Sequence, residues 1–488
     1  MDKTAGLDSF VKSGFFRIAA MAIATFLILI VNREFGVADN GDFSRYMANL
    51  SSKPLDLTEN WPQQGSKDWN YRFFRQPLFY WSPPVDGFGK PSISSASLFW
   101  EIGKKFNDFF YSENVFNLKY AGLPFFLFHA LAIFYILHFI VPSGLSGATV
   151  FIGALLVFVD PRITAFYNSL YGESVPILAV FLLTSFFFER IFSNMDKPAS
   201  PAVRRIFGAL VLAMLAISTL AKVQYLYFLA PALFLAYFIL ESEFNIEKYK
   251  KNILLLVFVS VLFGAVGFLT TSRLDNPNEV NGSRVQSYHA LYYGVLPQSK
   301  NPTKIMEKLG LPADSQALIG RNAWNAASSK LISEEKNLNL KTFLMAIYID
   351  PLAFMGSVLS NAEEVGNFEV FLGMVHGSAR TYPPLFLSGA TVGMTKISGV
   401  ILFGVACFLA FVSFIFPFGV PPQRRFPSRV FSAILLVILV SDVFISTFDG
   451  RPDARKHLLI ASITCLMIMI HSIACLIGLL RKRPMDRI

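Results

Sequence analysis

Ionisable residues of this sequence lie at the edges of long apolar runs, where charge is costly and functional roles are common. Directly after the first apolar run, Asp42, Arg45 and Tyr46 follow at the helical spacing i, i+3 and i+4. A carboxylate held beside an arginine in this way can act as a general base, while the arginine can bind a phosphate. The structural alternative is an interfacial helix with a local ion pair, capped by Asp39 or Asn40.

Two further sites flank later apolar runs. Glu173 directly precedes one run, and its structural alternative is a carboxylate that favours a helix N-terminus through the helix dipole. Lys222 lies in a tight turn between two runs, where a lone lysine can simply extend to the membrane interface. Gln224 follows two residues later and is a candidate for binding substrate.

A short loop near the end of the chain, residues 449–457, holds three cations beside two aspartates. It carries Arg451, Arg455 and Lys456, followed by His457, on the side of the membrane where short loops normally carry few cations. An anion bound by this loop explains the departure, and lipid headgroups are the alternative anion. We expect the three cations to bind a donor phosphate and His457 to contact substrate.

Carboxylates and cations gathered on one membrane face suit group transfer from a phosphate-linked lipid. A carboxylate takes the proton of an acceptor hydroxyl, and cations stabilise the departing phosphate. Asp42 is the expected base, with Asp39 or Glu173 as a second acid, and Arg45 and Lys222 beside the phosphate. The sequence has neither a Walker A pattern nor a dinucleotide fingerprint, so a lipid-linked donor is expected rather than a nucleotide sugar.

The composition shows which elements must position these residues. Of the 488 residues, 53% are hydrophobic and 16% are charged, against roughly 25% charged in soluble proteins. A soluble enzyme is therefore excluded. The net charge of +10 arises mostly from cations beside apolar runs, where topology explains them, so no nucleic-acid partner is expected. The three cysteines lie inside apolar runs and indicate neither disulfides nor a thiolate metal site.

Ten apolar runs predict an all-α polytopic membrane protein with both termini on one side. Basic short loops on that side, near residues 190–205, 248–251 and 424–429, identify it as cytoplasmic. The predicted spans are 18–31, 119–141, 145–160, 174–192, 205–221, 224–241, 252–271, 391–418, 428–447 and 457–480.

Two large segments are expected on the opposite, outer face. Residues 1–271 form an N-terminal transmembrane module whose first outer loop, 34–118, lies on the lipid headgroups. Residues 272–390 form an outer helical subdomain, and residues 391–488 a C-terminal transmembrane module. The helices expected in the subdomain span about 303–309, 313–334 and 340–361.

Aromatic residues and histidines of the outer face are weaker candidates. Tyr292 and Tyr293 could line a groove for a sugar or a lipid, and the alternative is an aromatic stripe buried inside the subdomain. His289, His376 and His457 lie outside the spans but lack ligand spacing such as His-Glu-x-x-His. We therefore predict no obligatory metal and no other cofactor.

The segment Asp42-Phe43-Ser44-Arg45-Tyr46 resembles the acidic first-loop motif of the GT-C superfamily of glycosyltransferases. Asp42 matches the catalytic aspartate and Arg45 the arginine that follows, whereas Phe43 stands where many members have a second acid. The sequence is also similar to a bacterial subgroup of WsfD-like hexose transferases. The segments that carry this similarity are Asn40-Gly41-Asp42-Phe43, Asn168-Ser169-Leu170-Tyr171-Gly172-Glu173, Lys222-Val223-Gln224, Tyr292-Tyr293-Gly294-Val295-Leu296, Leu309-Gly310-Leu311-Pro312 and Asp449-Gly450-Arg451.

The resemblance implies an inverting membrane glycosyltransferase of cell-envelope glycan biosynthesis. Its donor would be a polyprenyl-phosphate-linked hexose, its acceptor a glycan or a lipid-linked molecule, and its location the bacterial cytoplasmic membrane with an extracytoplasmic active site. A transporter or flippase of a lipid-linked saccharide is the main alternative, because Asp442 is an acid within a predicted span. Asp442 would otherwise form hydrogen bonds within the helix bundle. A non-catalytic scaffold ranks last.

Overall fold

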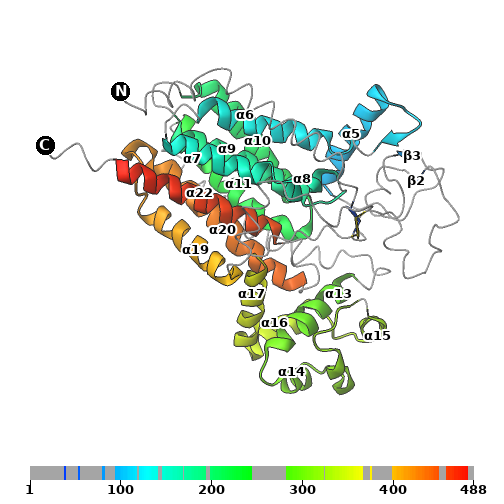
Figure 1. Ribbon diagram of the computed structural model, residues 1–488. Coiled ribbons are helices and arrows are strands. Elements are labelled where there is room, and N and C mark those ends of the chain that lie inside the picture. Colours follow the sequence, from blue (N-terminus) through cyan, green and yellow to red (C-terminus); the bar gives the residue numbers. More distant parts are fainter. Residues whose placement is uncertain are drawn as a thin grey trace.

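The computed structural model shows a mainly helical protein (Figure 1). The residues that the structure describes are 38–39, 53–54, 80–82, 94–117, 120–140, 145–168, 170–193, 198–244, 282–323, 325–365, 374–375, 398–449 and 458–481. Their helices form an elongated membrane bundle and a smaller helical subdomain beside one end of it. A helical membrane fold is confirmed.

The bundle contains helices from both halves of the chain. They are α6 (Leu123–Phe139), α7 (Leu145–Phe158), α9 (Ser174–Phe192), α10 (Pro201–Ser218), the 3-10 helix η5 (Val223–Phe228) leading into α11 (Leu229–Phe244), α19 (Gly399–Ile415), α20 (Arg425–Asp449) and α22 (Leu459–Arg481). These helices fall in eight of the ten predicted spans; the other two, 18–31 and 252–271, lie outside the described residues.

Only some of the described helices are both long enough and apolar enough to cross a membrane as a single helix. Five can do so, or six if the bent pair α16 (Leu340–Ile349) and α17 (Pro351–Val365) is counted as one span. Three more apolar helices, α6, α7 and α19, are shorter than a full span. Ten spans therefore remain a prediction.

Helix α9 is the centre of the bundle. In its mainly apolar span 94% of the residues are buried, whereas only 33% are buried in the span of α10. A helix that is apolar on every side belongs inside a bundle, and α6, α7, α10, α20 and α22 all pack against α9. The C-terminal helices also pack on the N-terminal ones, α22 on α7 and α20 on α11, so the two transmembrane modules share one bundle.

The subdomain is built from short helices with well-defined starts. These are α13 (Gly282–Tyr288), the π-helix η7 (His289–Val295), η8 (Leu296–Gln298), α14 (Pro302–Lys308), η9 (Ala313–Leu318), α15 (Ala326–Glu334), α16 and α17. Side chains of Asn301, Asn325, Asn339 and Asp350 accept hydrogen bonds from backbone N–H groups at the starts of α14, α15, α16 and α17. Such caps satisfy helix donors that lack an intrahelical partner.

Two of the three expected subdomain helices are each divided in the structure. The helix expected over 313–334 is wrong as one element, because Gly320 has φ +79° and separates η9 from α15. The helix expected over 340–361 bends by 107° between α16 and α17. Pro351 causes the break, because it disfavours helical geometry at Asp350 and has no N–H to continue the hydrogen-bond ladder. The expectation of a helix near 303–309 is confirmed by α14.

The first outer segment contains a helix that the sequence did not predict, α5 (Ala96–Phe110). It buries Phe99 and Trp100, and Gly103 lets it approach α6 closely, since a Cβ there would lie 2.4 Å from the carbonyl oxygen of Tyr120. In the described residues, five very short strands form two antiparallel sheets. In one, β1 (Ala38–Asp39) pairs with β5 (Met374–Val375), and in the other β3 (Tyr80–Ser82) lies between β2 (Lys53–Pro54) and β4 (Phe116–Asn117).

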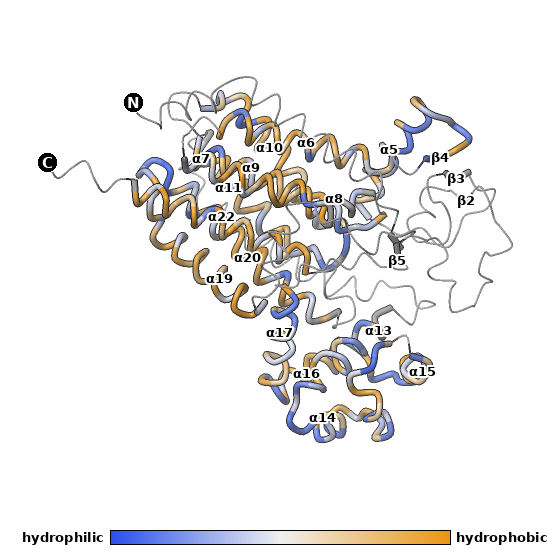
Figure 2. Tube along the Cα trace, in the orientation of Figure 1, coloured by the Kyte–Doolittle hydropathy of each residue, from blue (hydrophilic) through white to orange (hydrophobic). Residues whose placement is uncertain are grey.

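The hydropathy of the chain follows this architecture. Apolar residues dominate the bundle helices, whereas polar and apolar residues alternate through the subdomain (Figure 2). The two ends of the bundle are named here after the two glutamates of the α9 region. The Glu173 end holds the start of α9 and the subdomain, and the Glu189 end holds the last turn of α9 and the starts of α10 and α20.

Candidate functional site

Glu173 and Lys222 form an ion pair at the Glu173 end. Glu173 is the residue before α9, and Lys222 follows α10, so the antiparallel α9–α10 hairpin brings them to the same end. The Lys222 Nζ lies 2.7 Å from the Glu173 Oε1. The sequence places both residues on one membrane face, and the structure adds their direct contact.

Burial of the two partners is unequal. The Glu173 side chain is fully buried, whereas 17% of the Lys222 side chain is exposed. A buried carboxylate is strongly destabilised unless a cation and hydrogen bonds compensate its charge. The pair therefore holds an ammonium group at the boundary between the bundle interior and its surface.

The turn that carries Lys222 is fixed to two other membrane helices. Tyr227 of η5 donates a hydrogen bond of 2.7 Å from its hydroxyl to Asp442 Oδ1 in α20. The other carboxylate oxygen, Oδ2, accepts a bond of 2.9 Å from the Ala461 N–H in α22. Asp442 thus forms hydrogen bonds within the bundle, which is the structural alternative given for this acid in the sequence analysis. Tyr225, in the same turn, is fully buried close to Glu173, Lys222 and Asp442, and Gln224 is partly buried.

The subdomain is packed tightly on this end of the bundle. Asn361 of α17 donates a hydrogen bond of 3.1 Å to the Thr447 hydroxyl near the end of α20. Gly294 of η7 fits beside both helices, since a Cβ there would lie 3.1 Å from Ser357 Oγ and 3.7 Å from the Thr447 carbonyl oxygen. The end of α20 at Asp449 and the start of α22 therefore bring both attachment points of the basic loop 450–457 to the Glu173 end.

Most of the other predicted site residues are not part of the described structure. Asp39 lies in β1, where its backbone pairs with Met374 of β5, the strand that follows α17. This ladder brings the start of the first outer segment to the end of the subdomain. The predicted residues outside the described ranges are Asp42, Arg45, Arg451, Arg455, Lys456 and His457.

Tyr292 lies inside the subdomain. Its side chain is fully buried, its hydroxyl lies 2.5 Å from Ser315 Oγ, and its ring stacks on Tyr288 with centroids 4.8 Å apart. Burial raises the pKa of Tyr292 to about 12, so the phenol is neutral at physiological pH. This placement favours the structural alternative for Tyr292. Tyr293, the next residue, is partly buried.

No cluster of three or more histidine, cysteine, aspartate or glutamate side chains that could hold a metal occurs among the described residues. The ring nitrogen Nε2 of His289 accepts a hydrogen bond of 2.9 Å from the Ala323 N–H, which links η7 to the segment before α15. His376 lies outside the described ranges. The expected lack of an obligatory metal stays a prediction.

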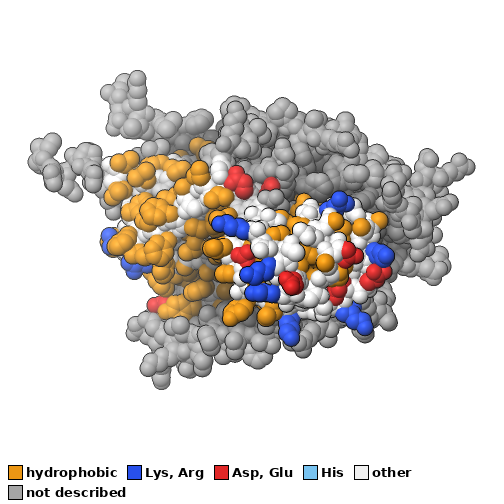
Figure 3. Space-filling model, turned by 90° about the horizontal axis from the view of Figure 1, so that it is seen from below, with side chains coloured by type: hydrophobic (Ala, Val, Ile, Leu, Met, Phe, Trp, Pro, Cys, Tyr) orange, Lys and Arg blue, Asp and Glu red, His pale blue; other side chains and the backbone are white. Residues whose placement is uncertain are grey.

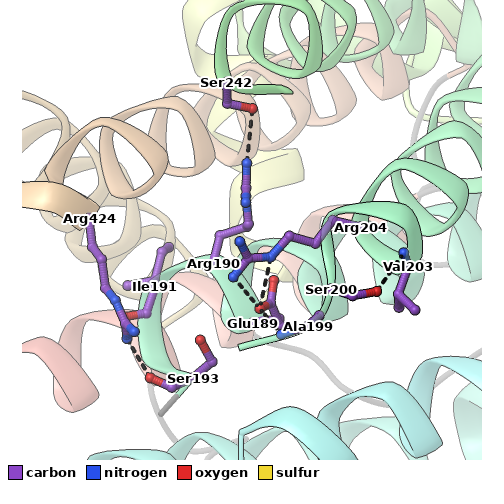
Figure 4. Close-up of polar contacts among 10 residues, drawn as sticks. All are labelled: Glu189, Arg190, Ile191, Ser193, Ala199, Ser200, Val203, Arg204, Ser242 and Arg424. Atoms are coloured by element: carbon purple, nitrogen blue, oxygen red, sulfur yellow. Dashed lines mark hydrogen bonds and ion pairs between the residues drawn. The ribbon is translucent and has the colours of Figure 1, made fainter. Parts of the chain in front are cut away.

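The Glu189 end contains a cluster of polar side chains (Figure 4). In the sequence, the basic residues of this cluster serve only to assign the cytoplasmic side. Glu189 is fully buried, and its Oε1 accepts bonds from Arg204 Nε at 3.2 Å and Nη2 at 2.9 Å. The Ala199 N–H donates to the same oxygen at 3.3 Å. Nearby, Arg190 donates to Ser242, and Arg424 donates to the carbonyl oxygens of Ile191 and Ser193. These bonds join α9, α10, α11 and the turn that immediately precedes α20.

Fold and site together define a polytopic helical membrane protein with a helical subdomain over one end of its bundle. The sequence model of the YfdI N-terminal transmembrane domain matches residues 5–347. The chain therefore belongs to the family with this domain. The match does not support the WsfD-like subgroup.

The comparisons with curated proteins and with solved structures give no further family assignment. No curated protein matches the sequence. A solved structure with some similarity is the crystal structure of ArnT from Cupriavidus metallidurans bound to undecaprenyl phosphate, at 14% identity and a TM-score of 0.26. The alignment covers 95% of this chain and 76% of that chain. This likeness is too weak to establish a shared fold.

Proposed function

We propose that this protein is a GT-C-type glycosyltransferase that moves a hexose from a polyprenyl-phosphate carrier to a glycan or lipid-linked acceptor. The observation that carries the proposal is the Glu173–Lys222 ion pair, which holds a cation at the end of the bundle where the subdomain packs. The resemblance of the segment from Asp42 to Tyr46 to the first-loop motif of that superfamily supports it. Membership in a family of transmembrane domains is consistent with a lipid-linked donor.

The proposed reaction is a single displacement at the anomeric carbon. The acceptor hydroxyl attacks this carbon and gives its proton to the Asp42 carboxylate, while the bond from the carbon to the phosphate oxygen breaks. The departing polyprenyl phosphate keeps the electron pair, and the configuration is inverted. Lys222 and Arg45, with the cations of the basic loop, stabilise the negative charge on that phosphate. No metal or other cofactor takes part in this step.

Glu173 has a positioning role in this scheme. Its carboxylate is fully buried and its Oε1 is in direct contact with the Lys222 ammonium. We assign it to orienting Lys222, which leaves Asp39 as the second acid proposed to act beside Asp42. Lysine suits this task, because its ammonium is a flexible point charge that can shift between a carboxylate and a phosphate.

The proposed location is the bacterial cytoplasmic membrane, with both termini in the cytoplasm and the Glu173 end facing outward. Arg190, Arg204 and Arg424 all lie at the Glu189 end, which suits the cytoplasmic side by the positive-inside rule. The active site would then face the compartment into which lipid-linked sugars are delivered for envelope glycans.

The test is sugar transfer by purified protein in nanodiscs, with a panel of polyprenyl-phosphate hexoses and release of the carrier phosphate as the readout. We expect turnover by the wild type and none by Asp42→Asn. Asp56→Asn is the matched control, because it makes the same change in the same outer segment outside the motif. Retained turnover in Asp42→Asn would exclude Asp42 as the base.

Transport of a lipid-linked saccharide gains no support from the bundle interior. Asp442, the acid that favoured transport, is hydrogen-bonded to Tyr227 and to the backbone of Ala461. Saturable binding of the lipid-linked sugar without turnover by any donor would nevertheless place transport ahead of transfer.

A further inference from the structure

The elbow formed by α16 and α17 carries an exposed apolar stripe that the proposed chemistry does not use. Six side chains make up this elbow stripe, and they are Leu344, Met345, Tyr348, Leu352, Met355 and Leu359. Their spacing of three and four residues places them along one face of each helix. Tyr348 is 83% exposed and Leu352 81% exposed, on either side of the bend. Six large exposed apolar side chains on two successive helices are unusual in contact with water.

The far end of α17 is fixed to the start of the membrane helix α19. Glu363 Oε2 accepts hydrogen bonds from the Ser398 hydroxyl at 2.6 Å and from the Val400 N–H at 3.1 Å. The backbones approach so closely that a Cβ on Gly399 would lie 2.0 Å from the Glu363 carbonyl oxygen. The position of α17 relative to the membrane is therefore set by α19.

The elbow stripe continues the lipid-facing surface of α19. Exposed apolar side chains follow one face of α19 as well, beginning with Ile401 and continuing through Val405, Phe408 and Phe411. Leu359 is one turn from Glu363, and Ile401 is close to the start of α19, so the two apolar faces meet at this corner. In Figure 3, hydrophobic side chains cover the bundle on the left, whereas Lys, Arg, Asp and Glu side chains are mixed with apolar ones over the subdomain on the right.

The opposite side of α17 is occupied by protein. Asn361 and Ser357 are buried against α20 and η7, where Asn361 binds the Thr447 hydroxyl. Together, α16 and α17 are apolar enough to pass as a span, yet their 107° bend prevents them from crossing a bilayer as one straight helix. An amphipathic element of this kind is suited to lie in the plane of the membrane interface.

We infer that the α16–α17 elbow is a membrane-interface anchor, with the elbow stripe inserted into the lipid leaflet at the Glu173 end. The occupant of this surface is the acyl region of the bilayer, and the argument is its continuity with the lipid-facing side of α19. Insertion holds the subdomain against the leaflet beside Lys222. The inference does not depend on the proposed transferase activity.

The test measures membrane depth with nitroxide spin labels in nanodiscs. Cys407 is replaced by serine, whereas the buried Cys465 and Cys475 are retained. Labels are introduced at Leu352→Cys and, as a second reporter, at Tyr348→Cys, both highly exposed positions. Glu334→Cys in α15, an exposed position of the same subdomain, is the matched control. Collision with oxygen, which enters lipid, is compared with collision with a water-soluble nickel chelate.

We expect a several-fold higher ratio of oxygen to nickel accessibility at Leu352 and Tyr348 than at Glu334. Equal ratios at the three positions would place the elbow in water and overturn the inference. Shielding of Leu352 and Tyr348 from both reagents would also overturn it, because protein, such as a second copy of the chain, would then cover the elbow stripe.

Discussion

The α9 region has a fully buried glutamate at each end, and the two are paired with different cations. Arg204 contacts Glu189 through two nitrogens of its planar guanidinium, and a backbone N–H reaches the same oxygen. Lys222 contacts Glu173 through one ammonium group at the end of a flexible side chain. Both pairs join neighbouring helices, yet only the first uses a donor whose geometry is rigid.

This difference distinguishes an ion pair that joins helices, Arg204–Glu189, from an ion pair whose cation can also contact another anion, Lys222–Glu173. A guanidinium bound through two donors loses both bonds when it turns to another anion, whereas an ammonium can contact a carboxylate and a phosphate together. Around Glu189, Arg424 is also bonded to carbonyl oxygens of the α9 end. We therefore expect charge changes at the Glu189 end to affect stability, and those at the Glu173 end to affect both stability and transfer.

Removal of the Lys222 charge is expected to have the largest effect. Lys222→Met should lower transfer by about 100-fold, as loss of one group that stabilises developing charge typically does. It should also destabilise the protein by about 3 kcal/mol, because Glu173 keeps a buried charge. Transfer rates and thermal unfolding in nanodiscs measure the two effects.

A double variant separates the two roles of Lys222. In Lys222→Met with Glu173→Gln, a neutral amide replaces the buried carboxylate, so unfolding should return toward the wild-type temperature while transfer stays low. Recovery of both properties would reduce the Glu173–Lys222 pair to a structural contact.

At the opposite end, Arg204→Met should destabilise the protein by a similar amount, about 3 kcal/mol, because Glu189 loses its cation. Transfer per folded molecule should be unchanged, since this cluster lies at the far end of the bundle. Adding Glu189→Gln should restore most of the stability. A loss of transfer in the folded Arg204 variant would remove the distinction between the two ends.

A smaller effect is expected where the Lys222 turn is held by α20. Asp442→Asn replaces one acceptor oxygen with an amide that faces a donor, Tyr227 or the Ala461 N–H. The expected cost is about 2 kcal/mol of stability, measured by thermal unfolding. Tyr227→Phe removes only one of these bonds and should cost less; an equal or larger loss would contradict the assignment.

The smallest effect is expected in the subdomain. Tyr292→Phe removes the hydroxyl that contacts Ser315, at a cost of about 1 kcal/mol. Transfer and the apparent affinity for the donor should not change, because the side chain is fully buried inside the subdomain. A marked increase in the KM for the donor would restore Tyr292 as a substrate contact.

Hydrophobic runs in the sequence predict the bundle well, because a membrane requires apolar helices of a definite length. They also place Glu173 and Lys222 at one end, since consecutive spans run in opposite directions. The direct ion pair has no motif of its own in the sequence, although the similar lengths of the two spans make the start of one level with the end of the next. The interpretations of Lys222 from sequence, a phosphate ligand or a cation that extends to the membrane interface, do not include this contact.

Among the remaining features, some have a local signature in the sequence and others depend on contacts that a single sequence does not display. The break at Pro351 could have been predicted, because the preceding Asp350 is a strong cap and a residue before proline disfavours helix. Helix α5 is harder to predict, since it lies within a segment whose many aromatic residues suit an interfacial loop, and the packing of Gly103 against Tyr120 and Ala121 shows where the helix lies. The hydrogen bond between Tyr227 and Asp442 joins residues far apart in sequence and has no local signature.

The ladder between β1 and β5 has a consequence for biosynthesis. Ala38 leaves the ribosome early, but its partner Val375 is made only after most of the spans and the whole of α17. At about 5–20 residues per second, the interval is tens of seconds. During that time β1 lacks its partner β5, so the ladder that joins the first outer segment to the segment after α17 forms only late in translation.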